Sequence, residues 1–503
     1  CVSMMQPKPN ETIIDPACGS GGFLMSALKY IQDNNPKLDT SKVVSQNIFG
    51  LDINRSIARI AKMKLLLEAN GKTNILCTNS LEDLDSVKLS LGQQNGFDLV
   101  LTNPPFGAKI TQSSVLSKFD LGHKWGNKNS EFYQTKTVYA NQNAEILFIE
   151  RCLQLLKEGG RMAIVLPNGN FENPSLDYLR YYIKQKAKVL AIVNLPQETF
   201  IPFGTGVKTS LLFLEKDTKN EEKHYPIFFG RITKLGYQGN KNGTPIYQKD
   251  KFGQIIKDEN KQPILDEDFS ATIENYKAFL KGKKIETENS FSIQFNELNG
   301  RFDYDFYSPE NRKLFSNLTN FKTIRLGDIC EIVKTKSRKL KDPNLIVEYV
   351  ELSDINTHSY EIINSTTSQV HELPSRASYE IEQGDIITAI AGNSVGTRKH
   401  ATALVTEDLA GSICTNGFRV LRNFKIDSYY LLYYLKSEMF LKQMFMYRTG
   451  AAIPNVSDTD LANIIIHLPE QKTIDDISNK MKKAFELRQA SKQQIESIEL
   501  EFA

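Results

Sequence analysis

The chain has 503 residues, of which 40% are hydrophobic, and its 62 Lys and Arg nearly balance its 59 Asp and Glu, for a net charge of +3. The length allows two to four domains, and the balanced charge means that any DNA contact must come from a local patch. The six cysteines lack the spacing of a zinc site or a disulfide framework, and no apolar run is long enough to span a membrane. We therefore expect no metal, no membrane partner and a cytoplasmic location.

A glycine-rich turn follows the first predicted strand. Ile13-Ile14 ends a short apolar run, Asp15-Pro16 stops it, and apolar residues at helical spacing begin at Phe23. The glycines do not follow the G-x-G-x-x-G of a dinucleotide site, and the preceding carboxylate suits an amino-acid-like ligand better than a phosphate. A strand-to-helix turn without a ligand remains open. The predicted cofactor contacts here are Asp15, Ala17, Gly19, Ser20, Gly21, Gly22 and Phe23.

Three more strands are predicted, at 48–54, 75–77 and 97–102. The strand at 48–54 places Asp52 and Ile53 at its carboxyl end, where a carboxylate can meet ribose hydroxyls. Asp52 could equally belong to a helix N-cap region. The fourth delivers Asn103 to the carboxyl end of the sheet, the edge where ligands gather in open α/β sheets. The third strand exits into Asn79, Ser80 and Leu81, which complete the predicted cofactor contacts.

The tetrapeptide Asn103-Pro104-Pro105-Phe106 matches the needs of a reaction at an exocyclic amine. The lone pair of the adenine N6 amine is delocalised, so an enzyme must accept hydrogen bonds from both amine hydrogens to localise it. The Asn103 side-chain oxygen and the Pro104 carbonyl supply two acceptors, and the prolines fix the backbone in advance. Phe106 offers a face for a base that has left the duplex. These four residues are the predicted catalytic group.

Residues 1 to about 215 resemble the catalytic domain of the DNA amino-methyltransferases of the gamma type, in which the cofactor motif precedes Asn-Pro-Pro-Phe. They are most similar to the modification subunit of type I restriction-modification systems and to type IIG enzymes. The segments that carry the resemblance are 15–24, 103–107, 143–148, 159–167 and 203–214. It implies an α/β fold with a Rossmann-like class I methyltransferase sheet, S-adenosylmethionine as cofactor, adenine N6 in DNA as target, and Phe203 as a second residue against the flipped base.

Two departures from the family stand out. Asn79 occupies a position where the family usually has an acidic residue, and the chain begins at Cys1, although relatives have a helical domain before this point. We therefore expect an N-terminally truncated catalytic domain. Methylation of cytosine N4, amino-methylation of protein or RNA, and a catalytically incomplete DNA-binding component remain open.

The chain is predicted to have four parts. The catalytic domain covers 1–230, a polar extension or linker 231–300, a target-recognition domain 301–470 and a coiled-coil helix 471–503. The third part resembles the α+β recognition domain of type I specificity subunits, through the segments 324–330, 383–397, 409–412 and 450–456. Double-stranded DNA is thus the expected partner, and any cleavage is expected to come from a missing N-terminal part or from a separate restriction subunit.

The last two predictions concern the recognition domain and the final helix. A basic cluster is predicted to contact phosphates, with a solvated lysine loop as the alternative. Apolar residues of the final helix recur in steps of three and four, interrupted by two polar positions. We expect a homodimer or docking on a helical domain; intramolecular packing is the alternative. The basic cluster is Lys334, Lys336, Arg338, Lys339 and Lys341, and the helix seam is Ile474, Ile477, Met481, Ala484, Arg488, Ser491, Ile495, Ile498 and Phe502.

Overall fold

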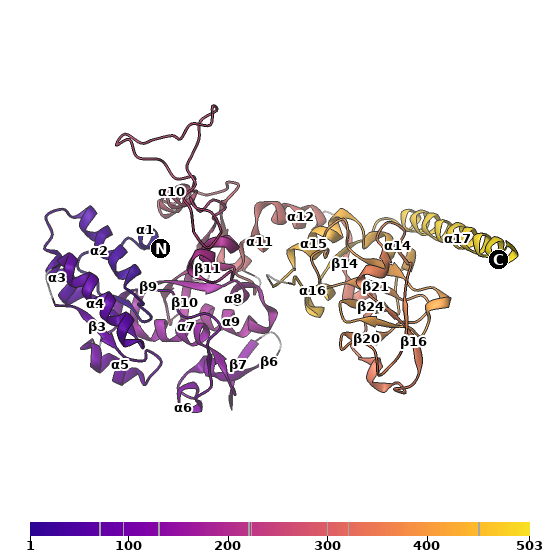
Figure 1. Cartoon of the computed structure of the whole chain (residues 1–503), viewed down its shortest axis with the longest axis horizontal. Helices are drawn as coiled ribbons and strands as arrows, with labels where there is room; N and C mark the ends of the chain where they lie inside the picture. Colours follow the sequence, from indigo (N-terminus) through magenta and orange to yellow (C-terminus); the bar gives the residue numbers. More distant parts are fainter. Residues whose placement is uncertain are drawn as a thin grey trace. The chain divides into compact units, whose positions relative to one another are not determined.

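The structure, a computed structural model, describes residues 1–69, 72–93, 95–128, 131–219, 222, 224–298, 300–319, 321–450 and 453–502. The chain divides into two compact units, Cys1–Tyr304 and Asp305–Ala503 (Figure 1).

The first unit is built on one sheet, whose strands in the described residues follow the order β13-β12-β10-β11-β9-β4-β1-β2-β3. β1, β2, β3, β4 and β9 pair in parallel, while β11 is antiparallel to both of its neighbours. The carboxyl ends of the parallel strands therefore meet at one edge. The bounds are β1 Ile13–Asp15, β2 Ile48–Asp52, β3 Asn74–Cys77, β4 Phe97–Thr102, β9 Leu156–Pro167, β10 Ala187–Asn194, β11 Thr209–Lys216, β12 Pro226–Arg231 and β13 Ser290–Gln294.

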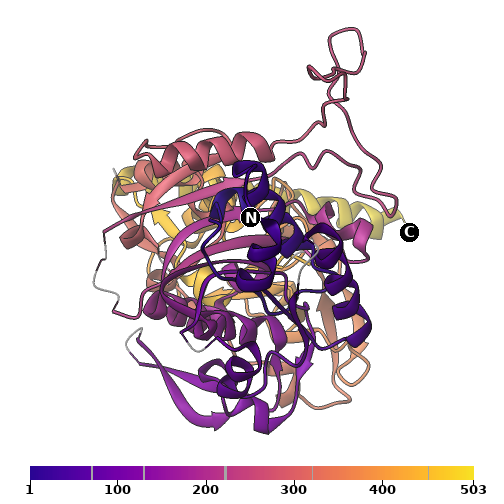
Figure 2. The same ribbon diagram turned by 90° about the vertical axis from the view of Figure 1, so that its left-hand side faces the viewer.

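Helices cover both faces of this sheet (Figure 2). Ile13 and Ile14 are both fully buried although successive strand residues face opposite sides, as expected for a parallel sheet covered on both faces. The predicted Rossmann-like α/β fold is thus confirmed. The main helices are α1 Val2–Met5, α2 Gly22–Asn34, α3 Thr40–Asn47, α4 Arg55–Ala69, α5 Leu84–Leu91, α7 Ala144–Leu155, α9 Asp177–Lys186 and α10 Phe269–Leu280.

Smaller elements fill the stretch between β4 and α7. β5 pairs with β8, and β6 and β7 form a hairpin. Their bounds are β5 Lys109–Ile110, α6 Ser113–Leu116, β6 His123–Lys128, β7 Glu131–Val138 and β8 Gln142–Asn143.

The segment 231–300 differs from the predicted extension or linker. Residues 233–268 form an exposed arm held by isolated bridges such as Tyr247↔Leu265, and the chain then returns through α10 to β13. β13 pairs with β12 and buries Phe291 and Ile293, so it completes the catalytic sheet. The polar composition of 231–300 predicted no strand, because β13 is short and its pairing with the distant β12 depends on the tertiary fold. The division between compact units accordingly falls after Tyr304.

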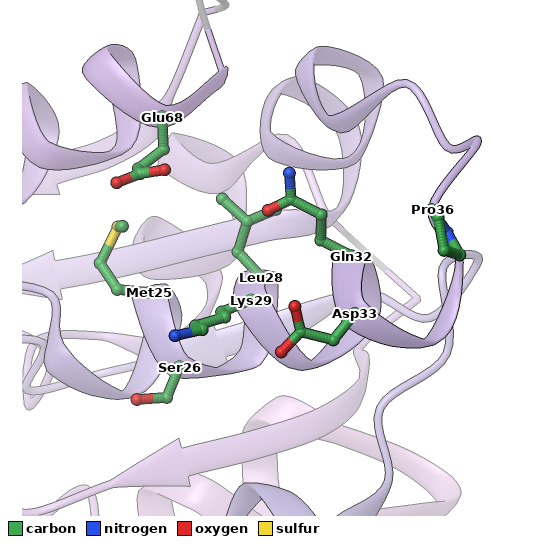
Figure 3. A pocket seen from close by; sticks show the side chains of 8 residues that line it. All are labelled: Met25, Ser26, Leu28, Lys29, Gln32, Asp33, Pro36 and Glu68. Carbon is green, nitrogen blue, oxygen red and sulfur yellow. The ribbon is translucent and has the colours of Figure 1, made fainter. Parts of the chain in front are cut away.

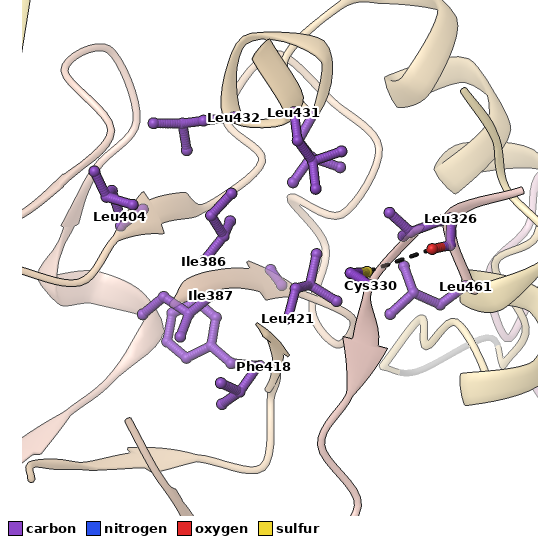
Figure 4. Close-up of a cluster of buried hydrophobic side chains, with 14 of the residues drawn as sticks. Leu326, Cys330, Ile386, Ile387, Leu404, Phe418, Leu421, Leu431, Leu432 and Leu461 are labelled. Atoms are coloured by element: carbon purple, nitrogen blue, oxygen red, sulfur yellow. Dashed lines mark hydrogen bonds between the residues drawn. The ribbon is translucent and has the colours of Figure 1, made fainter. Parts of the chain in front are cut away.

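The second unit is an α+β domain with two four-stranded sheets in its described residues, β15-β24-β21-β22 and β19-β16-β23-β20. Its largest apolar cluster joins Ile386 and Phe418 of the first sheet to Leu431 and Leu461 of the helices (Figure 4). The strands are β14 Thr323–Arg325, β15 Glu331–Ile332, β16 Ile346–Val350, β17 Ile355–Asn356, β18 Glu361–Ile362, β19 Thr366–Gln369, β20 Ala377–Glu380, β21 Ile386–Ala389, β22 Thr402–Leu404, β23 Ile413–Thr415, β24 Phe418–Arg422 and β25 Ile465–His467. The helices are α11 Tyr304–Tyr307, α12 Pro309–Thr319, α13 Leu326–Ile329, α14 Ser428–Tyr434, α15 Glu438–Met446, α16 Asp458–Ala462 and α17 Gln471–Phe502.

The final helix, α17, uses its first half to pack on the second unit. Ile474 and Phe485 are buried in the same apolar cluster, and the Arg488 guanidinium donates to the Ser359 carbonyl at 2.8 Å. Ile495 is 55% exposed. The first half of the predicted seam therefore makes intramolecular contacts, and the pairing of the second half stays a prediction. The side chains of Ile498 and Phe502 lie outside the described residues, as do Ala451 and Ala452 of the predicted recognition motif.

Candidate functional site

The chain turns sharply between β1 and α2. Gly19 and Gly21 have φ of +53° and +83°, a region that residues with side chains rarely adopt. Gly21 also lies against α4, since an added Cβ would sit 3.2 Å from the Cβ of Ala61. The backbone N–H of Cys18 donates to the Leu51 carbonyl at 2.9 Å, which fixes the turn to β2. Of the other predicted contacts in the turn, Ser20 and Gly22 are exposed and Ala17 and Phe23 are half-buried.

Asp15 is a buried carboxyl group at the start of this turn. Its Oδ1 accepts the backbone N–H of Ala17 at 3.0 Å, and only 2% of the residue is exposed. Burial, with a smaller contribution from the nearby charge of Asp52, raises the pKa of Asp15 to about 7. A cationic group bound beside Asp15 would favour the ionised carboxylate.

Asp52 connects β2 to the glycine turn. Its Oδ2 accepts the Gly19 N–H at 3.0 Å and its Oδ1 accepts the Asn54 N–H at 2.7 Å. A carboxylate has about four acceptor positions, so both oxygens retain capacity for a ligand hydroxyl. The adjacent Ile53 is 72% exposed and gives the same edge an apolar surface.

The residues after β3 differ in their burial and in their hydrogen bonds. The Ser80 hydroxyl donates to the Pro16 carbonyl and thereby supports the glycine turn, and both Ser80 and Leu81 are buried. The Asn79 Oδ1 accepts the Leu81 N–H at 3.0 Å. Among the described residues the Asn79 amide nitrogen has no hydrogen-bond partner, which leaves it available to an acceptor.

The Asn103–Phe106 loop begins directly after β4. β1 and β4 are adjacent, with Ile14 opposite Val100, so this loop and the glycine turn leave the same edge of the sheet. Asn103 is exposed and Pro104 is buried. Within the described part of the chain, neither the Asn103 side chain nor the Pro104 carbonyl has a hydrogen-bond partner. Both predicted acceptors are therefore unpaired in that part of the chain.

Glu145, which sequence reasoning gave no role, holds the end of this loop. Gly107 has a φ of +70° and donates its N–H to the Glu145 Oε2 at 3.1 Å. The Ala144 N–H donates to the Ala108 carbonyl at 2.8 Å, one residue further on. Glu145 is 3% exposed and lies in the first turn of α7. The only sequence signal was its place in the family-like segment 143–148.

Three phenylalanines form a row beside the loop. The Phe106 ring is 6.2 Å from the ring of Phe200, which is 6.4 Å from that of Phe203. Phe106 is half-buried, while Phe203 is 78% exposed at the end of the 3-10 helix Gln197–Phe203. Phe200 was missed from the sequence, although its three-residue spacing from Phe203 was a usable signal. The row joins the two residues predicted to stack on the target base.

Only some residues of the basic cluster in the second unit bond to other parts of the protein. The Arg338 guanidinium donates to the carbonyls of Val370, Leu373 and Pro374, and the Lys341 ammonium lies 2.7 Å from Glu380. These two side chains support the fold of the domain. Those of Lys334 and Lys336 are exposed, and that of Lys339 lies outside the described residues.

Other features give no competing site. An open hollow of about 720 Å³ lies along α2 between Lys29, Asp33 and Glu68 (Figure 3), but no predicted site residue lines it. Cys18 is buried, which raises its pKa to about 12, so its thiol stays protonated. Over the described ranges, no group of His, Cys, Asp or Glu could hold a metal ion. No helix in those ranges has the length and apolarity needed to cross a bilayer.

The comparisons with known proteins agree with this geometry. The N-6 DNA Methylase family matches residues 1–306, more than half of the chain. The chain belongs to the N-6 DNA methylase family. Residues 319–497 match the type I restriction modification DNA specificity domain. Both predicted resemblances are thus confirmed.

Individual relatives cover only parts of the chain. The methylase subunit of type I restriction enzyme EcoEI from Escherichia coli is 29% identical over 44% of this chain and 41% of its own length. The type II restriction enzyme and methyltransferase RM.BcgI from Heyndrickxia coagulans is 24% identical over 42% of this chain and 29% of its own. The HsdS subunit structure from Thermoanaerobacter tengcongensis has 28% identity and a TM-score of 0.28, over 36% of this chain and 47% of that one. The chain spans about two fifths of the length of the first curated relatives, at 41%, 40% and 40%.

Proposed function

We propose that this chain transfers a methyl group from S-adenosylmethionine to adenine N6 at a specific DNA sequence. The observation that carries the proposal is the adjacency of β1 and β4, which brings the glycine turn and the Asn103–Phe106 loop to one edge of the sheet. The free side chain of Asn103 and the free carbonyl of Pro104 at that edge support an amine substrate.

The residues around the glycine turn fit S-adenosylmethionine. The buried Asp15 suits an ammonium group, as in the amino-acid end of this cofactor, since an adjacent cation would favour its charged form. Asp52 has acceptor capacity for ribose hydroxyls, and exposed Ile53 and the Asn79 amide suit the face and edge of an adenine. When bound, the cofactor supplies a methyl group on a positively charged sulfur.

The loop residues prepare the amine. The Asn103 Oδ1 and the Pro104 carbonyl accept the two N6 hydrogens, which localises the nitrogen lone pair toward the incoming methyl carbon. Phe106, Phe200 and Phe203 hold the base by stacking outside the duplex. As the new N–C bond forms from the lone pair, the bond between the methyl carbon and the sulfur would break and its electron pair would neutralise the sulfur; one N6 proton then leaves to water. No strong base is required, because the methylated amine is acidic at that stage.

The second unit supports sequence specificity. The names of the relatives lead us to place the chain in a restriction-modification system, with double-stranded DNA as partner, a separate restriction subunit and a cytoplasmic location. Within the basic cluster we propose Lys334 and Lys336 as phosphate contacts, since their side chains are exposed. Base readout would come from other side chains in the grooves.

The outer half of α17 supports pairing with a second copy. Leu487 and Ile495 are 62% and 55% exposed on a helix whose first half already packs on its own unit. We propose that this outer half forms a two-helix contact between copies. Sedimentation of the chain and of a form that stops after Arg488 tests this: an unchanged mass for the shortened form would contradict the homodimer.

The direct test of function uses methyl-labelled S-adenosylmethionine and genomic DNA. N6-methyladenine at one recurrent sequence is expected, and N4-methylcytosine would refute the choice of base. Asn103→Ala should bind the same DNA but methylate it far more slowly. A matched control is Asn127→Ala, an exposed asparagine of the β6–β7 hairpin. Equal turnover by Asn103→Ala and the control would refute the role of the loop.

A further inference from the structure

The exposed arm 233–268 leaves the sheet at the edge where the proposed reaction takes place. β12 runs parallel to β10, and β9 and β10 are both antiparallel to β11, so β12 points the same way as β9 and β4. The arm follows the last residue of β12 and therefore begins at the carboxyl edge. It projects away from the sheet in both views (Figures 1 and 2).

The base of the arm contacts the segment that carries the exposed phenylalanines. The Tyr237 hydroxyl donates to the Thr199 carbonyl at 2.7 Å. A Cβ added to Gly239 would sit 2.4 Å from the Cβ of Glu198, and one added to Gly243 would sit 3.2 Å from Pro202. The first turn of the arm is thus packed against the 3-10 helix that ends at Phe203.

The acidic side chains of the arm mostly bond to the arm itself. The Asp250 Oδ1 accepts the N–H groups of Phe252 and Gln254 at 2.8 and 2.9 Å. Asp258 closes the next turn in the same way, through the Gln262 N–H at 2.8 Å. Asp266 is paired with Lys234, and Asp268 accepts backbone N–H groups at the base of the arm. Three of these carboxylates, those of Asp250, Asp258 and Asp268, accept backbone N–H groups, and the fourth is paired with a lysine of the arm.

The lysines of the outer arm are different. Lys249, Lys257 and Lys261 are exposed, and in the part of the chain that the structure describes their ammonium groups have no hydrogen-bond or ion-pair partner. The Glu259 side chain is also exposed, and its carboxylate has no hydrogen-bond or ion-pair partner in that part of the chain. Phe252 lies between the lysines and is 77% exposed. A segment that carries both free cations and an exposed aromatic side chain suits DNA, because cations bind the phosphates and an apolar side chain can enter a groove.

We infer that the arm 233–268 binds the DNA duplex beside the target base, with Lys249, Lys257 and Lys261 on phosphates. This rests on the proposed function, because the partner is the DNA whose base enters the site. The first turn of the arm packs against the 3-10 helix that ends at Phe203. The residues that bind the duplex would therefore lie next to those that stack on the target base. This role is separate from sequence readout by the second unit.

The test replaces Lys249, Lys257 and Lys261 together by Ala in the full chain. Its matched control replaces Lys8, Lys219 and Lys281 by Ala, three exposed lysines at the amino edge of the sheet. Lys8 lines a hollow together with Pro226, the first residue of β12, and with Leu280, which precedes Lys281. Lys219 follows the end of β11, which is antiparallel to β9. DNA affinity is measured by fluorescence anisotropy from about 50 to about 200 mM salt. Thermal melting checks that both variants are folded.

Loss of three phosphate contacts should weaken binding at least ~10-fold near 100 mM salt and make the log–log salt slope shallower by about 2 to 3. The control should bind like the unmodified chain. Methyl transfer at saturating DNA should change less than ~2-fold, since these lysines contact neither base nor cofactor.

Each other outcome has one meaning. If the arm variant binds and responds to salt like the control while the unmodified chain methylates DNA, the inference is wrong and the proposed function stands. If the variant alters the mass of the protein without DNA and leaves DNA affinity unchanged, the arm contacts protein and the inference is again wrong. If the unmodified chain neither binds nor methylates DNA, both fail.

Discussion

Asp15 makes cofactor binding depend on pH in a calculable way. Burial raises the pKa of this carboxyl to about 7, so most molecules of the free protein have a protonated Asp15 below that pH. An ammonium ligand pairs only with the ionised form, and an α-amino group stays protonated up to about pH 7.5. From pH 5.5 to 7.5 the ionised fraction of Asp15 rises from about 3% to about 75%, so affinity should rise about 25-fold over this range.

The variant Asp15→Asn keeps an oxygen acceptor for the Ala17 N–H but cannot ionise. It should bind weakly at every pH, with a flat profile. Asp33→Asn, a change of the same size at the exposed end of α2, should keep the wild-type profile. Isothermal calorimetry with S-adenosylmethionine at a series of pH values measures all three. A flat profile for the unmodified chain would refute the assignment of Asp15 to the ammonium group.

The same shift affects stability with a defined sign. The folded-state pKa of Asp15 lies above the unfolded value, so folding favours the protonated form. This contribution to stability is present in acid and is lost as the pH rises from the unfolded pKa of about 4 to about 7. Bound cofactor should reduce that loss.

Three further predictions follow from the site and the final helix. Asn103→Ala should lower kcat about 10²- to 10³-fold in single-turnover assays, with a DNA affinity within ~3-fold of that of the unmodified chain. A smaller loss of kcat would contradict a catalytic role of the Asn103 side chain. Glu145→Ala should lower kcat about tenfold by freeing the Gly107 N–H, without weakening cofactor binding, whereas Glu145→Gln retains an acceptor and should restore most activity. Phe485→Ala should destabilise the second unit by ~3 kcal/mol in denaturant melts and Ile495→Ala by less than ~0.5 kcal/mol; equal costs would contradict the packing of α17.

The sequence predicted the parts of the fold and site that depend on local order along the chain. The four strands that end at Asp15, Asp52, Cys77 and Thr102 lie close to their predicted positions. Each strand is an apolar run followed by polar residues, a pattern that can be recognised in the sequence without knowing which strands pair. The edge shared by the glycine turn and the Asn103 loop follows from the parallel arrangement of those strands.

The missed features depend on contacts between distant segments. Phe200 and Glu145 join the site only because the 3-10 helix and α7 pack beside the Asn103 loop. Arg338 looked like a phosphate contact, since a sequence does not reveal the three carbonyls that surround it. The first half of α17 has a coiled-coil spacing, but an amphipathic stripe fits its own domain as well as a second helix.

The late return of β13 also constrains how the first unit folds and where it can be cut. β12 is rich in buried apolar residues, including Ile227, Phe228 and Phe229, and its outer edge is covered only by a strand more than fifty residues later. Until residues 290–294 leave the ribosome, that edge offers unpaired backbone groups to any neighbouring chain. A catalytic fragment that ends after β12 should therefore aggregate, whereas one that ends at Tyr304 should stay dispersed.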